Sequence, residues 1–264
     1  MKNLRNLSLL VLLLTVLPAM GASKLRYFRA EKSDSIQILF VGNSYTYHHD
    51  VPGKLRNLAA SIGKKIAPSQ ALRGGETLKG HYERDLFRKM LAEGGFDYVV
   101  IQEASYLPSR STKDVATNVY PYAHKIDSLA KAGSPDAKIL YYMTWGHKYG
   151  VRDANKTDYP VNHTYKGMQA RLRTSYLEMA YDNKGICAPV GDAWEAVVNE
   201  RPDIELYNSK DHYHQSEAGA YLSACTILST ILGEPFESDY YSKLPKDVAL
   251  YLQRKACEAA AKQR

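Results

Sequence analysis

A serine, an aspartate and a histidine have the types and spacing that nucleophilic catalysis needs. Ser44 comes two residues after an apolar run, Ile38-Leu39-Phe40-Val41-Gly42, so its hydroxyl would lie where a buried strand ends. Far downstream, Asp211 precedes His214 by three residues, just before an apolar helical stretch. An imidazole can take the proton of a serine hydroxyl, and a carboxylate can hold the second nitrogen of that imidazole. These residues predict a Ser-His-Asp triad.

The rest of the chain alternates short β-rich runs with longer runs of helical period, which is typical of parallel β-α-β units. We expect strands at residues 36–41, 65–72, 98–102, 138–144 and 186–190. We expect helices at residues 55–62, 78–92, 115–132, 165–181, 216–232 and 246–262, and a long loop at residues 146–163. The pattern predicts an α/β fold: a three-layer α/β/α sandwich around a flavodoxin-like, five-stranded parallel sheet.

Several polar or glycine-rich segments fall just after the predicted strands. Ser44 follows the first strand, Gly74-Gly75 the second and Gln102-Glu103 the third. In open parallel sheets, ligands bind beyond the carboxyl ends of the strands, where the loops meet. We therefore expect these segments and the Asp211–His214 stretch to share one edge of the sheet.

Four of these segments resemble the conserved blocks of SGNH/GDSL-type serine hydrolases, and the resemblance spans nearly all of the chain after residue 22. The overall pattern also resembles exported members from carbohydrate-degrading gut bacteria. The blocks are Gly42-Asn43-Ser44-Tyr45-Thr46, Gly74-Gly75-Glu76-Thr77, Val99-Val100-Ile101-Gln102-Glu103 and Asp211-His212-Tyr213-His214.

The resemblance implies a role for each residue of the site. His214 would be the base for Ser44, and Asp211 would orient the imidazole. The oxyanion would be held by the N–H groups of Ser44 and Gly75 and by a side-chain amide. The family supplies that amide from a Gly-x-Asn-Asp block, which this chain lacks, and Gln102 is the nearest replacement. No metal or cofactor is implied.

Two further side chains are candidates for contact with substrate. His81 follows the glycine block and Trp145 ends the fourth predicted strand, so both are expected near the cleft. Packing in the core is the alternative for Trp145. A metal cluster of His48, His49, Asp50 and His81 with Asp211 is a weaker hypothesis because no metal-binding motif accompanies these residues.

Composition limits the class of protein. The chain has 264 residues, 45% hydrophobic, which suits one domain, expected at residues 23–264. Residues 1–22 have a basic start, an apolar centre and a small-residue end, which predicts a cleaved signal peptide and a periplasmic or secreted protein without lasting membrane association. The formal charge of +7 is spread along the chain without a nucleic-acid motif, so nucleic acid is not an expected partner.

Cys187, Cys225 and Cys257 cannot all pair within one chain, and buried thiols are the preferred interpretation. The oligomeric state stays open.

The preferred functional hypothesis is a carboxylic-ester hydrolase acting on a small-molecule or glycan ester, specifically a carbohydrate O-acetylesterase. A lipolytic esterase and an acyltransferase would use the same triad. A non-catalytic glycan-binding protein is the alternative from another class, since the oxyanion block departs from the family pattern.

Overall fold

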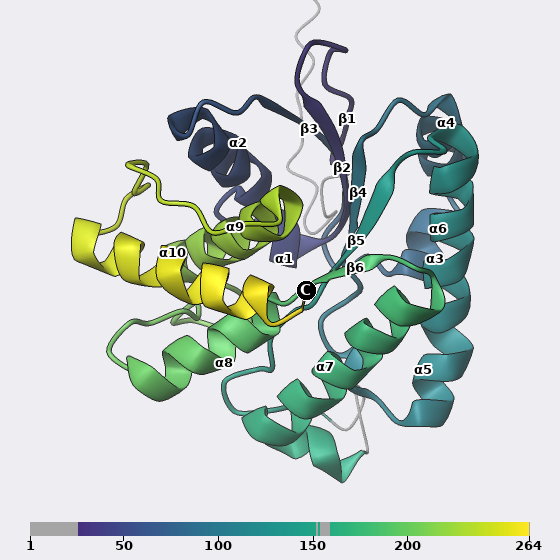
Figure 1. The fold of residues 1–264 in the computed structure, drawn as a ribbon. Coiled ribbons are helices and arrows are strands. Elements are labelled where there is room, and N and C mark those ends of the chain that lie inside the picture. The colour runs from purple at the N-terminus through teal and green to yellow at the C-terminus, as the bar shows by residue number, and fades with distance from the viewer. Residues whose placement is uncertain (1–25, 152, 154–158, 264) are drawn as a thin grey trace, which may run out of the picture.

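A central sheet organises the molecule (Figure 1). The computed structural model describes residues 26–151, 153 and 159–263. The strands of this part of the chain are β1 (Arg26–Phe28), β2 (Ile36–Gly42), β3 (Ile66–Leu72), β4 (Tyr98–Ile101), β5 (Lys138–Tyr142) and β6 (Ile186–Ala188). They lie in the order β1-β3-β2-β4-β5-β6. All neighbours are parallel except β1, which pairs antiparallel with β3 at one edge.

The five parallel strands confirm the predicted flavodoxin-like sheet. In their own chain order, they lie in the sequence second, first, third, fourth and fifth. The carboxyl end of β2 therefore lies between those of β3 and β4, at the point where the strand order reverses. In open parallel sheets this is where ligands bind, and Ser44 lies two residues after Gly42, the residue with which β2 ends.

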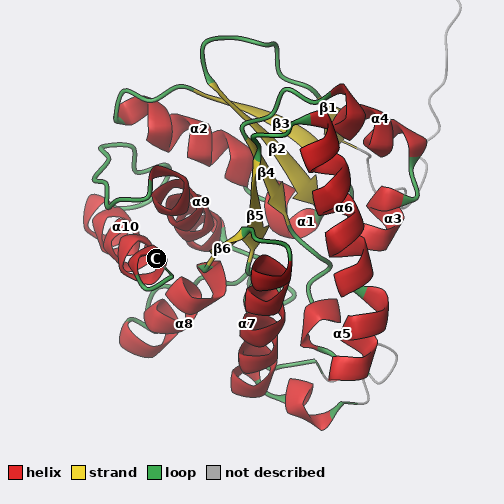
Figure 2. Cartoon of the chain, turned by 45° about the vertical axis from the view of Figure 1, so that its right-hand side comes forward, coloured by secondary structure: helices red, strands yellow, loops and turns green. Residues whose placement is uncertain are grey.

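Helices cover both faces of the sheet (Figures 1 and 2). On one face lie α2, α8, α9 and α10, and on the other lie α3 to α7. The helices are α1 (Ser44–Tyr47), α2 (Val51–Ser61), α3 (Leu78–Tyr82), α4 (Asp85–Glu93), α5 (Thr112–Asn118), α6 (Tyr120–Gly133), α7 (Tyr165–Asp182), α8 (Val190–Glu200), α9 (Glu217–Leu232) and α10 (Lys246–Ala261).

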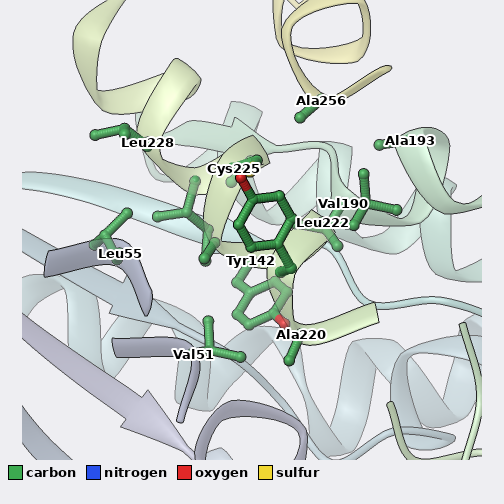
Figure 3. Close-up of a cluster of buried hydrophobic side chains, with 14 of the residues drawn as sticks. Val51, Leu55, Tyr142, Val190, Ala193, Ala220, Leu222, Cys225, Leu228 and Ala256 are labelled. Carbon is green, nitrogen blue, oxygen red and sulfur yellow. The ribbon is translucent and has the colours of Figure 1, made fainter. Parts of the chain in front are cut away.

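Alternation along β2 shows how the strands form two cores. Ile38 and Phe40 belong to the cluster on the α2 and α9 face, whereas Leu39 and Val41 belong to the cluster on the other face. Because successive strand residues point to opposite faces, a strand covered on both sides is apolar throughout. Figure 3 shows the first cluster, where Tyr142 of β5 lies among side chains from α2 and α9.

The structure corrects several expected elements. β1, α1 and α8 were not expected; β1 and α1 have only three and four residues. The helix predicted at residues 78–92 is two helices, because Arg84 has extended backbone (φ −89°, ψ 123°). The one predicted at 115–132 is also divided, at Val119. Pro121 in the first turn of α6 has no N–H to continue the preceding helix.

The three cysteines are buried and unpaired. Burial raises the pKa of the Cys187 and Cys225 thiols, so neither is a ready nucleophile. The predicted signal peptide lies outside the described residues. None of the helices that are described is long and apolar enough to cross a membrane.

Candidate active site

Ser44 is the first residue of α1 and sits just beyond the carboxyl end of β2. Asn43 caps this helix, its side-chain oxygen accepting a hydrogen bond from the backbone N–H of Tyr45 at 3.1 Å. The strand is buried, but Ser44 itself is only partly covered. A buried strand and a capped helix therefore present the partly exposed hydroxyl at the edge of the sheet.

The structure brings the three residues of the predicted triad together. His214 Nε2 lies 2.8 Å from Ser44 Oγ, and His214 Nδ1 lies 2.8 Å from Asp211 Oδ2. Because a carboxylate only accepts, Nδ1–H must donate to Asp211, which leaves Nε2 to accept the serine proton. This is the direction of proton flow that a serine nucleophile requires.

Asp211 is held in its ionised form. Partial burial would raise the pKa of its carboxyl, but hydrogen bonds outweigh this effect and lower the pKa below its ordinary value. The donors are the His214 ring and the backbone N–H groups of Tyr213 and His214, the latter two bonding Oδ1 at 3.1 and 3.0 Å. The same bonds fold the loop tightly around the carboxylate.

A second imidazole lies against the candidate base. The ring of His48 stacks on His214 with the centroids 4.5 Å apart and the planes at 15°. Burial, followed by the neighbouring His214, lowers the pKa of His48. The neutral ring therefore supports one face of His214 without competing for its charge. Sequence reasoning considered His48 for a metal cluster and missed this contact.

Two backbone N–H groups are available beside Ser44. Among the described residues, none accepts a hydrogen bond from the N–H of Ser44 or of Gly75. Gly75 has φ +68°, a left-handed conformation that suits glycine. Its turn is tied to the nucleophile segment because Asn43 Nδ2 donates to the carbonyl of Glu76 at 2.9 Å. Unpaired donors near a nucleophile are what an oxyanion needs.

Gln102 does not fit the predicted role as the third oxyanion donor. Its Oε1 accepts from the Asn43 backbone N–H and the Thr46 hydroxyl, both at 3.0 Å. Its Nε2 donates to Asn43 Oδ1 at 3.1 Å and to the carbonyl of Glu103. Both amide hydrogens are thus used inside the protein, and the side chain is 1% exposed. Gln102 instead fixes the segment that carries Ser44.

Gly42 permits this packing of Gln102. A Cβ atom added to Gly42 would lie 2.5 Å from Gln102 Oε1, which is too close for any other residue. The first glycine of the Gly-Asn-Ser segment is therefore required by the close approach of a buried amide.

The expectation that His81 and Trp145 contact substrate is wrong, because both are fully buried. Burial lowers the pKa of His81 to about 4, so its neutral ring donates from Nε2 to the Gly42 carbonyl at 2.8 Å. Trp145 stacks between Tyr45 and Trp194, at 4.7 and 4.0 Å between ring centroids. Both side chains thus pack in the core against the segment that carries Ser44.

A polar and aromatic group that the sequence did not single out lies beside the triad. The ring of Tyr213 is 4.5 Å from that of His214 and 5.0 Å from that of His147. His147 Nε2 lies 3.3 Å from Ser105 Oγ, which comes from the loop after β4. The only available signal was the position of Ser105 and His147 just beyond two strand ends.

The loop predicted at residues 146–163 touches the base segment at its start. The Lys148 N–H donates to the carbonyl of His212 at 3.0 Å, and the rings of Tyr149 and His212 meet edge to face at 5.2 Å. Residues 152 and 154–158 of this loop lie outside the described residues.

The alternative metal cluster is not formed in the part of the chain that the structure describes, where no three histidine, cysteine or acidic side chains are grouped for a metal ion. His49 instead pairs with Glu217 at 3.0 Å.

The comparisons with known proteins agree with this fold. A protein from Slackia heliotrinireducens, assigned as an SGNH hydrolase, is 26% identical, with 75% of this chain and all of that one covered at a TM-score of 0.60. The chain has the SGNH-hydrolase fold. The predicted resemblance to SGNH/GDSL-type serine hydrolases, and with it the enzyme class of a serine esterase, is supported by this likeness.

More distant structures show the same fold. A DUF4886 family protein from Bacteroides uniformis is 17% identical, with 88% of this chain and 97% of that one covered at a TM-score of 0.71. An acetyl xylan esterase, AlAXEase, is 17% identical, with 74% and 100% covered at a TM-score of 0.54. No protein-family model matches the sequence, and the search of curated proteins found no match.

Proposed function

We propose that the chain hydrolyses carboxylic esters through Ser44, His214 and Asp211. The observation that carries the proposal is the pair of 2.8 Å contacts that links the serine oxygen to the imidazole and the imidazole to the carboxylate. A hydroxyl in such an arrangement can attack an acyl carbon as its proton passes to the imidazole.

The reaction follows in two steps. Ser44 Oγ bonds to the ester carbonyl carbon while its proton moves to His214 Nε2, and the oxyanion lies against the N–H groups of Ser44 and Gly75. The C–O bond to the alcohol then breaks, and His214 gives that alcohol the proton. Water repeats the sequence on the acyl-enzyme and releases the acid, while Asp211 stabilises the imidazolium in both steps.

The surroundings of the triad favour a short acyl group on a polar alcohol. The rings of His48 and Tyr213 contact that of His214, His147 contacts Tyr213, and Ser105 lies next to His147; all four are polar or aromatic. A long acyl chain would gain little from such neighbours, whereas partly exposed tyrosine rings can stack on sugar faces. A carbohydrate O-acetylesterase is therefore the preferred activity, and the fold shared with an acetyl xylan esterase is consistent with it.

We further propose an exported location and a single domain for this enzyme. Export through a signal peptide at residues 1–22 would place the enzyme, as a single domain from residue 23, in the periplasm or outside the cell. Extracellular glycans would then be its accessible substrates.

The experiment is hydrolysis of p-nitrophenyl acetate by the purified protein and by Ser44→Ala. The variant should lose roughly 10⁴-fold or more of kcat, because removing one triad member removes the nucleophilic route. Ser209→Ala, a change at an exposed serine in the loop before Asp211, should keep full activity. Hydrolysis that survives in Ser44→Ala would refute the proposal.

Three further measurements separate the alternatives. Faster turnover of the octanoate than of the acetate ester would favour a lipolytic enzyme. Acetyl transfer to an added alcohol in place of acetate release would favour an acyltransferase. Glycan binding without labelling of Ser44 by a fluorophosphonate would favour a non-catalytic protein.

A further inference from the structure

The single turn of α1 cannot satisfy its own carbonyl groups. The last carbonyls of any helix lack partners within the helix, and α1 has no second turn to supply them. The N–H of His48 donates to the Ser44 carbonyl at 3.0 Å. No backbone N–H among the described residues donates to the carbonyls of Tyr45 or His48. The segment that carries the nucleophile therefore depends on groups from elsewhere.

The side chain of Gln215 supplies the missing donors. Its Nε2 lies 3.0 Å from the carbonyl oxygens of Tyr45 and His48, and 3.3 Å from that of Ser44. The side chain is fully buried. Because all three partners only accept hydrogen bonds, the orientation of the amide is fixed. Together with the Tyr142 hydroxyl, which donates to the Tyr45 carbonyl at 3.3 Å, this amide holds the carbonyl side of the turn on which Ser44 sits.

Gln215 also follows directly after the candidate base. The amide that holds α1 and the ring that faces Ser44 are consecutive residues, so any shift of one displaces the other. The ring of His48, at the end of the same turn, stacks on His214, which is a second contact between the turn and the base. We propose that Gln215 is a positioning residue that fixes the distance between Ser44 Oγ and His214 Nε2. This inference rests on the proposed function.

The side-chain oxygen of Gln215 contributes nothing to the stability of the fold. This atom, Oε1, is buried and has no hydrogen-bond partner among the described residues, which is destabilising. Gln253, in α10, is equally buried, but its Oε1 accepts from the Ser238 N–H at 2.9 Å. Its Nε2 donates to the Tyr221 hydroxyl at 2.8 Å and the Ser238 carbonyl at 2.9 Å.

These two glutamines provide a matched test. Methionine keeps the length of the side chain and removes its hydrogen bonds. Gln215→Met should lower kcat for p-nitrophenyl acetate by about 10²-fold with KM within about 3-fold, because a small misplacement of reacting groups has effects of that size. The rate at which a fluorophosphonate labels Ser44 should fall by a similar factor. Gln253→Met should lower Tm further and change kcat by less than about 3-fold.

The outcomes distinguish this inference from the proposed function. If Gln215→Met keeps the kcat of Gln253→Met while Ser44→Ala is inactive, the positioning role is wrong and the triad stands. If Ser44→Ala is active, the proposed function itself fails. Should the methionine variant not fold, Gln215→Asn serves, since it withdraws the amide by one methylene. It should show the same loss of kcat at unchanged KM, and full activity in this variant would overturn the inference.

Discussion

Ser44 and His214 lie 2.8 Å apart but belong to segments built in different ways. The serine follows a buried strand, and the polar side chains around it, Asn43, Thr46 and Gln102, are 1–2% exposed and hydrogen-bonded to one another. The segment from Asp211 to His214 is only partly buried and is a loop. A buried polar network is costly to break, whereas a partly exposed loop can change with little cost.

This difference predicts that substitutions in the two segments affect different properties of the protein. Substitutions in the network around Ser44 should weaken folding, because they leave buried donors or acceptors unpaired. Loss of the Asp211 or His214 side chain from the base loop should remove activity and leave folding nearly intact. Each prediction below tests one side of this contrast.

The largest expected effect is the loss of activity on the loop side. His214→Ala should lower kcat for p-nitrophenyl acetate by roughly 10⁴-fold or more, because no other group can take the proton of Ser44. The free energy of unfolding, from urea titration, should change by less than about 1 kcal/mol at this partly exposed position.

The control for this variant is the neighbouring histidine. His212 has φ +61°, so His212→Asn is the suitable change because asparagine tolerates this backbone conformation. It should keep most of the activity. Equal losses in the two variants would show that the loop as a whole, and not the imidazole of His214, is needed.

The next effect is a loss of stability on the strand side. Gln102→Met removes the acceptor of the Asn43 N–H and the Thr46 hydroxyl, and should cost about 2–4 kcal/mol of unfolding free energy. Urea denaturation measures this cost, and kcat per folded molecule measures what remains of catalysis. A variant with native stability but a much lower kcat would contradict the structural role and restore Gln102 as an oxyanion donor.

The outcome for Gln102 shows what sequence reasoning could reach. Its place at a strand end follows from the pattern, since an apolar run defines β4 and the parallel order defines the shared edge. The direction of its amide does not, because that depends on Gly42 leaving room for a side chain 60 positions away. The sequence could single out Ser44, His214 and Asp211 as candidates because the chemistry of a triad restricts both residue type and spacing.

The role of Gln215 could not be predicted from the sequence either. Its partners are backbone carbonyls about 170 residues away, and a carbonyl group has no sequence signature. The three-residue β1 and the four-residue α1 were missed because elements so short carry no periodicity. Local pattern predicts which groups share an edge, but the hydrogen bonds that align them are a property of the folded chain.

A further expected effect is a pH dependence of stability at Glu103, beside Gln102. Burial raises the pKa of its carboxyl to about 8, against an ordinary value of 4.5, although two backbone N–H groups bond one oxygen. Between these values the folded protein keeps a proton that the unfolded chain releases. Glu103 therefore contributes stability that is complete below about pH 4.5 and is lost as the pH rises through about 8.

Glu103→Gln removes this proton exchange and keeps an acceptor for both N–H groups. The free energy of unfolding, measured by urea titration from pH 5 to pH 9, should fall in the native protein relative to the variant as the pH rises. This relative loss should level off above about pH 8, as the raised pKa requires. Glu83→Gln, at an exposed position, is the control and should lack this profile. If the unfolding free energies of native protein and Glu103→Gln vary with pH in the same way, the Glu103 carboxyl is ionised in the folded protein. The segment around Ser44 would then differ from the base loop in its geometry and not in the burial of its polar groups.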